Sequence, residues 1–289
     1  MKTNYFKYFL ILIAVIFWGN SFIAVKIALR ELAPVTIVTL RLIIAVSILF
    51  IAGKFLRNSF AIQKKNFIGI LILALIAAFH IWIQITGVNY TTAANSGWII
   101  GTAPVFMAIL GLIFFREKIS FLKLLGIIVA IFGLLLLVGK GDFLSISLIE
   151  NKGDFLVLFS SFTWGVYSMV NKKISLSYPP LMTIFYLFLF MMLIMLPFSL
   201  SGEAIYSVIH LSVNGWIAVI FLGMFCSGIS YVIWAQALRD MESARVGAFL
   251  YLEPFVTVLS AWLLLNELIT PVMMLGGIII IIGVILVNK

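Results

Sequence analysis

Two charged side chains lie within long apolar stretches of this sequence, where an unpaired charge is costly. Arg41 falls in the stretch 34–53, and Glu253 falls in the stretch 244–265 beside Pro254. An arginine at the centre of a lipid-facing helix costs about 2.5–3.5 kcal/mol, so we expect Arg41 to face other helices, as a structural or a substrate-binding group. Glu253 is a candidate for substrate binding or proton coupling. Its alternatives are an ion pair with Arg41 and hydrogen bonds to backbone groups that Pro254 leaves free.

A histidine and a glutamine share one face of a third apolar stretch. His80 and Gln84 are four residues apart in the stretch 66–86, so they lie on the same side of a helix. A histidine at mid-membrane depth can contact a proton or a substrate. The alternative is a neutral histidine that is hydrogen-bonded within the core.

Several aromatic residues have positions that suit the interior of a helix bundle. Trp18 and Trp164 lie at mid-depth, whereas tryptophans that anchor a helix lie at the membrane interface. Such residues can line a cavity that stacks on planar or apolar substrates, or they can serve interhelical packing alone. The candidate cavity residues, with Trp164 and His80 favoured, are Trp18, His80, Gln84, Trp98, Trp164, Tyr167, Tyr231, Trp234 and Glu253.

The composition requires that these residues be placed by membrane-spanning helices. Hydrophobic residues make up 64% of the 289 residues and charged residues only 10%, whereas about a quarter of a soluble domain is charged. Apolar runs near 20 residues recur, and each is long enough to cross a bilayer. We predict an all-α integral membrane protein with spans at 7–28, 34–53, 66–86, 91–115, 121–139, 154–173, 180–200, 213–237, 244–265 and 271–287.

The basic residues predict how these ten spans are oriented. Fourteen Lys and Arg residues fall on one side, against Arg30, Lys140, Lys152 and the nearby Lys26 on the other. Basic residues concentrate in cytoplasmic loops, so both termini are expected to be cytoplasmic, in the inner (cytoplasmic) membrane of a prokaryote. The net charge of +9 is thereby explained without a nucleic-acid partner. The first span has no cleavage pattern and is expected to be retained.

The chain contains an internal repeat. At a constant offset of 150, Pro104 matches Pro254 and Glu117 matches Glu267, and at an offset of 146 Trp18 matches Trp164. We therefore divide the chain into a first half, 1–143, and a second half, 150–289. Because each half has five spans, the second is inverted in the membrane. Inverted repeats hold a substrate site near the midplane at their interface and exchange conformations to give alternating access.

The sequence lacks the motifs of enzymes and of ATP-driven pumps. Cys226 is the only cysteine, which excludes an internal disulfide and a cysteine cluster for a metal. No phosphate-binding loop, H-E-x-x-H or G-x-S-x-G motif is present. We expect no catalytic residue, cofactor or metal. Glu117 and Glu267, at predicted helix ends, are expected to cap helices or to form pairs at the end of the bundle.

The repeated series resembles the drug/metabolite transporter superfamily, and in particular its EamA-like family of ten-helix carriers. The resemblance spans the chain and is carried by Trp18-Gly19-Asn20-Ser21, Pro34, Arg41, Ala93-Ala94, Pro104, Glu117, Ala244, Leu252-Glu253-Pro254, Asn266-Glu267 and Gly276. It implies efflux or uptake of small metabolites, amino acids among them, and on this resemblance alone we expect export. Leu187 stands where Arg41 would recur, so a role for that arginine would be confined to the first half.

These observations together predict a secondary transporter. We expect export of a small neutral or zwitterionic metabolite, such as an aromatic amino acid, with proton coupling through Arg41 or Glu253 as a further hypothesis. The alternatives are a multidrug or lipophilic-cation exporter and, from another class, a non-transporting sensor or assembly protein. The expected partners are the small-molecule substrate and the lipid bilayer, and the chain is a monomer or a homodimer.

Overall fold

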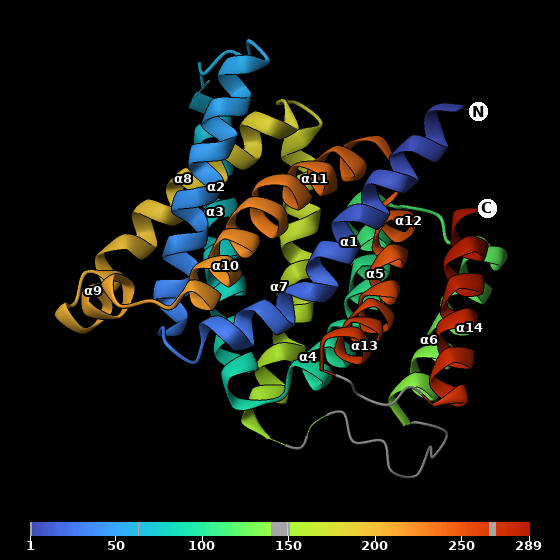
Figure 1. Cartoon of the computed structure of the whole chain (residues 1–289). Coiled ribbons are helices and arrows are strands. Elements are labelled where there is room, and N and C mark those ends of the chain that lie inside the picture. The colour runs from blue at the N-terminus through green and yellow to red at the C-terminus, as the bar shows by residue number, and fades with distance from the viewer. Residues whose placement is uncertain (1, 63, 140–148, 150, 266–269) are drawn as a thin grey trace.

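The protein is a bundle of helices in the computed structural model, which describes residues 2–62, 64–139, 149, 151–265 and 270–289 (Figure 1). The first half contains α1 (Lys2–Ala28), α2 (Pro34–Phe55), α3 (Lys64–Tyr90), α4 (Ala93–Ile100), α5 (Ala103–Phe115) and α6 (Phe121–Gly139). The second half contains α7 (Lys152–Ser175), α8 (Pro180–Met195), η2 (Leu196–Ser199), α9 (Gly202–Ile209), α10 (Val213–Phe221), η3 (Leu222–Ile229), α11 (Ser230–Asp240), α12 (Ser243–Ala248), η4 (Phe249–Tyr251), α13 (Leu252–Leu265) and α14 (Pro271–Asn288).

Helices occupy all ten ranges that the sequence predicts, and no described residue is in a strand. Six of the described helices are long and apolar enough to cross a membrane, and 121–136 and 274–288 form shorter apolar helices. The chain is therefore an all-α membrane protein, as its composition indicates. The short helix α9, whose N-terminus is capped by Ser201, was not predicted. Glu267 and Lys140 lie outside the described residues.

Two predicted spans are broken at matching prolines. The sequence predicts single helices over 91–115 and 244–265, but α5 begins at Ala103, just before Pro104, and a 3-10 turn precedes α13 just before Pro254. Proline has no N–H to donate, and its ring clashes with the carbonyl four residues earlier. The interruptions follow from this clash. A third break, the π-helical turn η3 between α10 and α11, has no proline.

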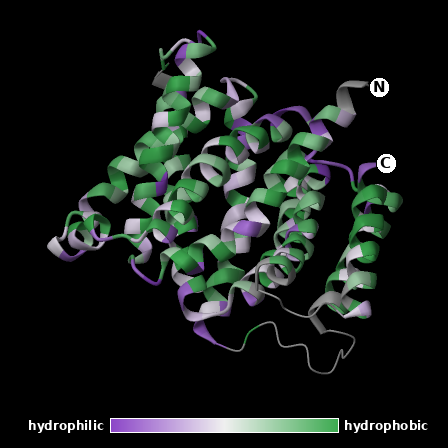
Figure 2. Cartoon of the chain, viewed as in Figure 1, coloured by the Kyte–Doolittle hydropathy of each residue, from purple (hydrophilic) through white to green (hydrophobic). Residues whose placement is uncertain are grey.

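Helix α7 runs through the middle of the bundle, and this position explains its polar sequence. It packs against α3, α4, α5 and α11. Figure 2 shows α7 paler than the strongly hydrophobic α6 and α14 at the edge of the bundle. Polar side chains buried along α7 bond mainly within the protein, so they need not face lipid. They include Ser160, Ser161, Thr163, Ser168 and Asn171.

Helices α6 and α14, which are equivalent in the two halves, pack against each other through matching glycines. A Cβ on Gly126 would lie 2.8 Å from the carbonyl oxygen of Gly283, and a Cβ on Gly133 would lie 2.8 Å from that of Gly276. The order of these contacts makes the two helices antiparallel, as Figure 1 also shows. Small residues let membrane helices approach at backbone distance.

Replacing Gly133 with leucine is expected to prevent this approach. The new side chain would meet the backbone of Gly276 and Ile280, and overpacking of this kind costs about 1–3 kcal/mol or more. Gly202→Leu is the matched control, because nothing lies within 4 Å of a Cβ at Gly202. Size-exclusion chromatography in detergent should show loss of the monodisperse peak for Gly133→Leu alone. Equal behaviour of the two variants would contradict the close packing.

Candidate functional site

A cavity lies between the two halves of the chain, at mid-depth in the bundle. Its volume is about 40 Å³, which is enough for a few water molecules and too small for an amino acid. Helices α1 to α4 of the first half and α7, α11, η4 and α13 of the second half contribute to its walls. The lining residues are Trp18, Ser21, Phe22, Val25, Arg41, His80, Ile81, Gln84, Ile85, Val88, Ile100, Trp164, Tyr231, Leu250 and Glu253.

Most of the residues that the sequence singles out lie around this cavity. Those that line it are Trp18, Arg41, His80, Gln84, Trp164, Tyr231 and Glu253. Trp98, Tyr167 and Trp234 do not line it, contrary to the prediction. Tyr167 stacks behind Trp164, with ring centroids 5.0 Å apart, and Trp234 donates its indole N–H to Ser168 at 3.3 Å. Trp98 is buried elsewhere in the bundle.

The two tryptophans at matching positions meet at the interface between the halves. Trp18 and Trp164 lie edge to face with ring centroids 5.2 Å apart and an interplanar angle of 84°. Tyr231 packs edge to face against both. Such aromatic pairs contribute about 0.5–1.5 kcal/mol each beyond their burial. The cluster therefore gives the cavity a rigid aromatic wall made by both halves.

His80 is held by helix α7. Its Nδ1 lies 3.0 Å from the carbonyl oxygen of Ser160 and 3.0 Å from the hydroxyl oxygen of Thr163. A carbonyl oxygen only accepts hydrogen bonds, so Nδ1 carries the proton. The ring also packs against Trp164 at 5.3 Å. His80 is thus a hydrogen-bonded core histidine, one of the two alternatives above, and at the same time a wall of the cavity.

Arg41 and Glu253 do not pair with each other, which corrects one hypothesis from the sequence. Both are described residues lining the cavity, and no ion pair joins them. The Arg41 Nε instead donates to the hydroxyl of Ser227 at 2.9 Å. Ser227 belongs to the π-helical turn η3, so this turn positions the arginine.

The same turn also positions Trp18. The Trp18 indole N–H donates to the carbonyl oxygen of Cys226 at 2.9 Å. π-helical turns inside longer helices are frequent at functional sites. Here the turn forms hydrogen bonds to two residues of the cavity wall, Trp18 and Arg41, through its adjacent residues Cys226 and Ser227. Nothing in the sequence distinguishes it beyond Gly223 and Gly228, which lie within the turn.

The apolar lining residues were missed by the sequence analysis. Phe22 and Val25 follow Trp18 at helical spacing on α1, and Ile81, Ile85 and Val88 share one face of α3. An apolar residue at such spacing is equally compatible with a packed core. The one signal that could have identified them is that they lie on the same helical faces as the candidate residues Trp18 and Gln84.

The cavity extends toward one end of the bundle. Its lining runs from Trp18 to Val25 on α1 and from His80 to Val88 on α3. At 1.5 Å per residue each run covers about 10–12 Å of helix. Both helices run from the end rich in Lys and Arg toward the end that has few. The cavity therefore reaches from mid-depth toward the end poor in basic residues.

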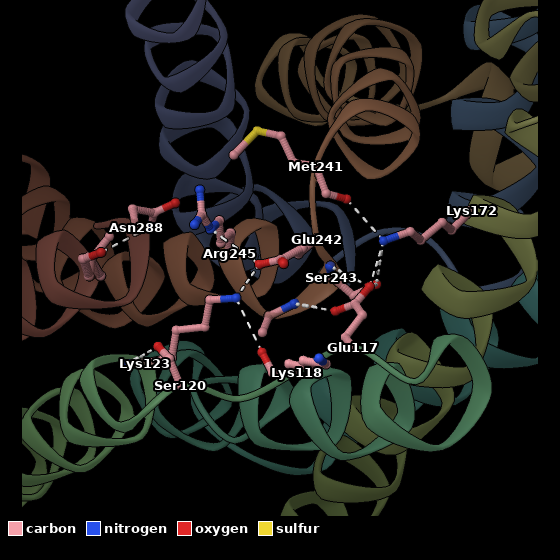
Figure 3. Close-up of polar contacts among 12 residues, drawn as sticks. Glu117, Lys118, Ser120, Lys123, Lys172, Met241, Glu242, Ser243, Arg245 and Asn288 are labelled. Carbon is pink, nitrogen blue, oxygen red and sulfur yellow. Dashed lines mark hydrogen bonds and ion pairs between the residues drawn. The ribbon is translucent and has the colours of Figure 1, made fainter.

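The opposite, basic end is closed by a polar network that joins the two halves (Figure 3). Glu117 of the first half accepts from Lys172 Nζ at 2.6 Å and from the backbone N–H of Ser243 at 2.9 Å. Lys172 also donates to the carbonyl oxygen of Met241 at 2.9 Å. We call this set, Glu117, Lys172, Met241 and Ser243, the basic-end network. The predicted pairing of Glu117 at a helix end is thus observed.

The Glu117 carboxyl stays ionised in this setting. Burial alone would raise its pKa, but hydrogen bonds from Lys172 and Ser243 and the charge of Lys172 outweigh burial and hold the pKa below its ordinary value. A second contact joins the halves beside it: Lys123 pairs with Glu242, which also pairs with Arg245 at 3.2 Å. Both contacts must break before the halves can separate at this end.

The comparisons with known proteins agree with this architecture. An "Uncharacterized transporter" of Archaeoglobus fulgidus is 31% identical over 278 residues, covering 95% of this chain and 94% of the relative. A "Probable amino-acid metabolite efflux pump" of Escherichia coli is 28% identical, covering 95% of this chain and 92% of that protein.

A solved crystal structure and a family of membrane proteins match the chain as a whole. The crystal structure has the same fold, with a TM-score of 0.76 over 96% of this chain and 94% of that chain, at 15% sequence identity. The EamA-like transporter family matches residues 5–139 and again residues 151–289. Each match covers one of the two copies of the repeat seen in the sequence. This chain is a membrane transporter that belongs to the EamA-like transporter family.

Proposed function

We propose that this transporter exports small neutral or zwitterionic metabolites, amino acids among them, across the cytoplasmic membrane by alternating access. The observation that carries the proposal is the cavity between the halves, where Trp18 and Trp164 meet at matching positions of the repeat. A site at the interface of two inverted repeats becomes accessible to each side in turn when the repeats exchange conformations. The distribution of basic residues supports a cytoplasmic location for both termini.

The charges around the cavity favour a substrate without net charge. Arg41 and Glu253, one residue of each sign, line the cavity, and its other walls are mostly apolar or aromatic. A lipophilic cation would be attracted by Glu253 but repelled by Arg41, so the cation-exporter alternative has weaker support. The Escherichia coli relative named as an amino-acid metabolite efflux pump supports the same substrate class.

The conformation described here supports the alternating-access part of the proposal. The basic-end network closes the cytoplasmic side, and the cavity reaches toward the outer side. With a volume of about 40 Å³ the cavity must widen before it accepts an amino acid. We infer that the cycle requires opening of the outer end in one state and rupture of the basic-end network in the other.

Counterflow in proteoliposomes tests the substrate class. Purified protein is reconstituted into vesicles loaded with unlabelled L-phenylalanine, L-leucine or L-serine, and uptake of the matching radiolabelled amino acid is measured. We expect transient accumulation of at least one of these, strongest for L-phenylalanine because of the aromatic wall. Repeating the assay with an imposed pH gradient tests proton coupling.

Two outcomes would change the proposal. Counterflow of a lipophilic cation such as tetraphenylphosphonium, without amino-acid counterflow, would favour the drug-exporter alternative. Absence of flux for the whole panel, by protein that elutes as a monodisperse peak, would contradict the proposed substrate class. It would leave the family assignment intact.

A further inference from the structure

We propose that Arg41 and Glu253 bind the opposite ends of an amino acid: Arg41 binds the carboxylate, together with the indole N–H of Trp164, and Glu253 binds the ammonium group. This assignment rests on the proposed transport of zwitterions. It defines the substrate as an α-amino acid whose side chain lies against the aromatic wall. It also gives a role to two buried ionisable side chains that share a cavity without pairing.

The guanidinium of Arg41 has donors to spare. The residue is only 4% exposed, and its single hydrogen bond within the described chain is the one from Nε to Ser227. Its two terminal nitrogens have no acceptor among the described residues. A buried guanidinium is costly unless its donors are satisfied. These nitrogens present the two-pronged geometry that carboxylates bind best.

The side-chain carboxyl of Glu253 has no partner among the described residues, like the two terminal nitrogens of Arg41. It is 4% exposed, lines the same cavity, and forms no ion pair and no side-chain hydrogen bond with any described residue. Burial of an acid in this way is expensive unless a cation or a hydrogen-bond donor reaches it. An ammonium group provides both a positive charge and three donors.

Trp164 adds an unpartnered donor, whereas the indole N–H groups of Trp18 in the aromatic wall and of Trp234 behind it are both bonded. Its Nε1 is buried and has no hydrogen-bond partner, and the side chain is 6% exposed. The Nε1 of Trp18 is satisfied by Cys226, and that of Trp234 by Ser168. Buried indole N–H groups usually have a partner. Because Trp164 lines the cavity, we assign the missing acceptor to a bound ligand.

The π-helical turn η3 keeps Arg41 available for this role. Because Ser227 holds Nε at 2.9 Å, the guanidinium is oriented before substrate arrives, which lowers the entropic cost of binding. Gly223 of the same turn lies against α2, where a Cβ would approach Ile44 within 2.7 Å. Turn and helix therefore form a single packed unit. Ser227 acts as a positioning residue for Arg41.

The test combines each variant with a ligand that lacks the group that the replaced residue is proposed to bind. Counterflow of radiolabelled L-phenylalanine is measured with three competitors: L-phenylalanine itself, L-phenylalaninamide, which has no carboxylate, and 3-phenyllactate, which has no ammonium group. The competitors are compared in wild type, Arg41→Gln and Glu253→Gln. Each result is expressed as the ratio of half-inhibitory concentrations between the analogue and L-phenylalanine.

In the wild type both ratios should exceed about ten, because each analogue lacks one charged group that forms hydrogen bonds in the site, and a tenfold loss of affinity corresponds to about 1.4 kcal/mol. Arg41→Gln should bring the amide ratio close to one and leave the phenyllactate ratio unchanged. Glu253→Gln should do the reverse. This crossed pattern separates a direct contact from a general loss of affinity.

Two further variants keep the assignment testable if Arg41→Gln is poorly folded. Trp164→Phe removes the indole N–H but keeps a ring, and should lower the amide ratio without affecting the phenyllactate ratio. Ser227→Ala frees Nε and should weaken L-phenylalanine binding while Arg41 remains charged. Size-exclusion chromatography checks that each variant is folded.

The outcomes distinguish this assignment from the proposed function. Phenylalanine counterflow with ratios that no variant changes would overturn the assignment and leave amino-acid transport standing. A swapped pattern, with Arg41→Gln changing the phenyllactate ratio alone, would overturn it as well. Failure of wild type to transport any amino acid of the panel would overturn the proposed function and, with it, the assignment.

Discussion

Replacing Trp164 with alanine is expected to lower amino-acid counterflow at least tenfold, the largest effect of any single aromatic substitution in this chain. Trp164 makes ring contacts with Trp18, His80, Tyr167, Tyr231 and Trp234. Its loss removes the centre of the wall that both halves share. Truncating a buried tryptophan also costs about 3–5 kcal/mol of stability, so counterflow is normalised to the folded fraction.

Two matched variants separate the transport effect from the loss of stability. Trp164→Phe keeps a ring in the wall and is expected to retain most of the stability, with weaker binding of carboxylate ligands. Trp82→Ala removes a side chain of the same size from α3, but Trp82 is 43% exposed on the outside of the bundle and should leave counterflow within about twofold, as for most surface substitutions. Equal losses in Trp164→Ala and Trp82→Ala would contradict the role of the aromatic wall.

The second large effect is expected at the basic-end network. Lys172→Met leaves the carboxylate of Glu117 buried without its cation, and breaking a buried ion pair in this way costs about 3–5 kcal/mol. If the network closes the cytoplasmic side, the ion pair exists only in the closed state. Its loss then destabilises the closed state and not the state open to the cytoplasm. The equilibrium then shifts toward the state open to the cytoplasm by roughly 10²–10⁴-fold.

Cysteine labelling measures this shift. The single native cysteine, Cys226, is buried, so Cys226→Ala provides a background without thiols. A cysteine introduced at Met107, which is fully buried beside Gly247 on the cavity side of the network, reports access from the cytoplasm. Its modification by an impermeant maleimide in inside-out vesicles should accelerate in Lys172→Met.

The charge-swapped double variant is the control for this prediction. Lys172→Glu with Glu117→Lys restores opposite charges across the same contact, and it should slow labelling again relative to either single variant. Unchanged labelling in Lys172→Met would contradict closure by this network.

The contribution of Glu117 to the stability of the fold also depends on pH. Because the pKa of its carboxyl is lowered in the fold, ionised Glu117 stabilises the folded protein at pH values above the ordinary pKa. This stabilisation is lost as the pH falls through the lowered pKa.

The sequence patterns predicted where the helices lie but not where two of them break. Helix ranges were predictable because each span is a long apolar run with its own flanking signals, and Glu117 was correctly placed in a bundle-end pair. The breaks before Pro104 and Pro254 follow from a local clash, yet both spans were predicted as single helices. The π-helical turn η3 had no local signal, because it depends on the packing of Gly223 against α2.

The candidate site was only partly predictable for a related reason. Trp18, His80, Trp164 and Glu253 were found because each is unusual at mid-membrane depth. Tyr167 and Trp234 are equally unusual, but they lie behind the wall, since residues three or four apart on a helix can face either a cavity or a neighbouring helix. Phe22 and Val88 line the cavity and look like ordinary core residues.

Composition, run length and spacing along the chain were enough to predict the class of the protein, its ten helical ranges, its repeat and its family. Which of the buried groups meet became clear from the packing of the helices. It placed Arg41 on Ser227 instead of on Glu253 and left the N–H of Trp164 without an acceptor. It also joined Lys172 to Glu117, 55 residues away. Such pairings depend on how helices distant in sequence rotate and pack against one another, which no local pattern specifies.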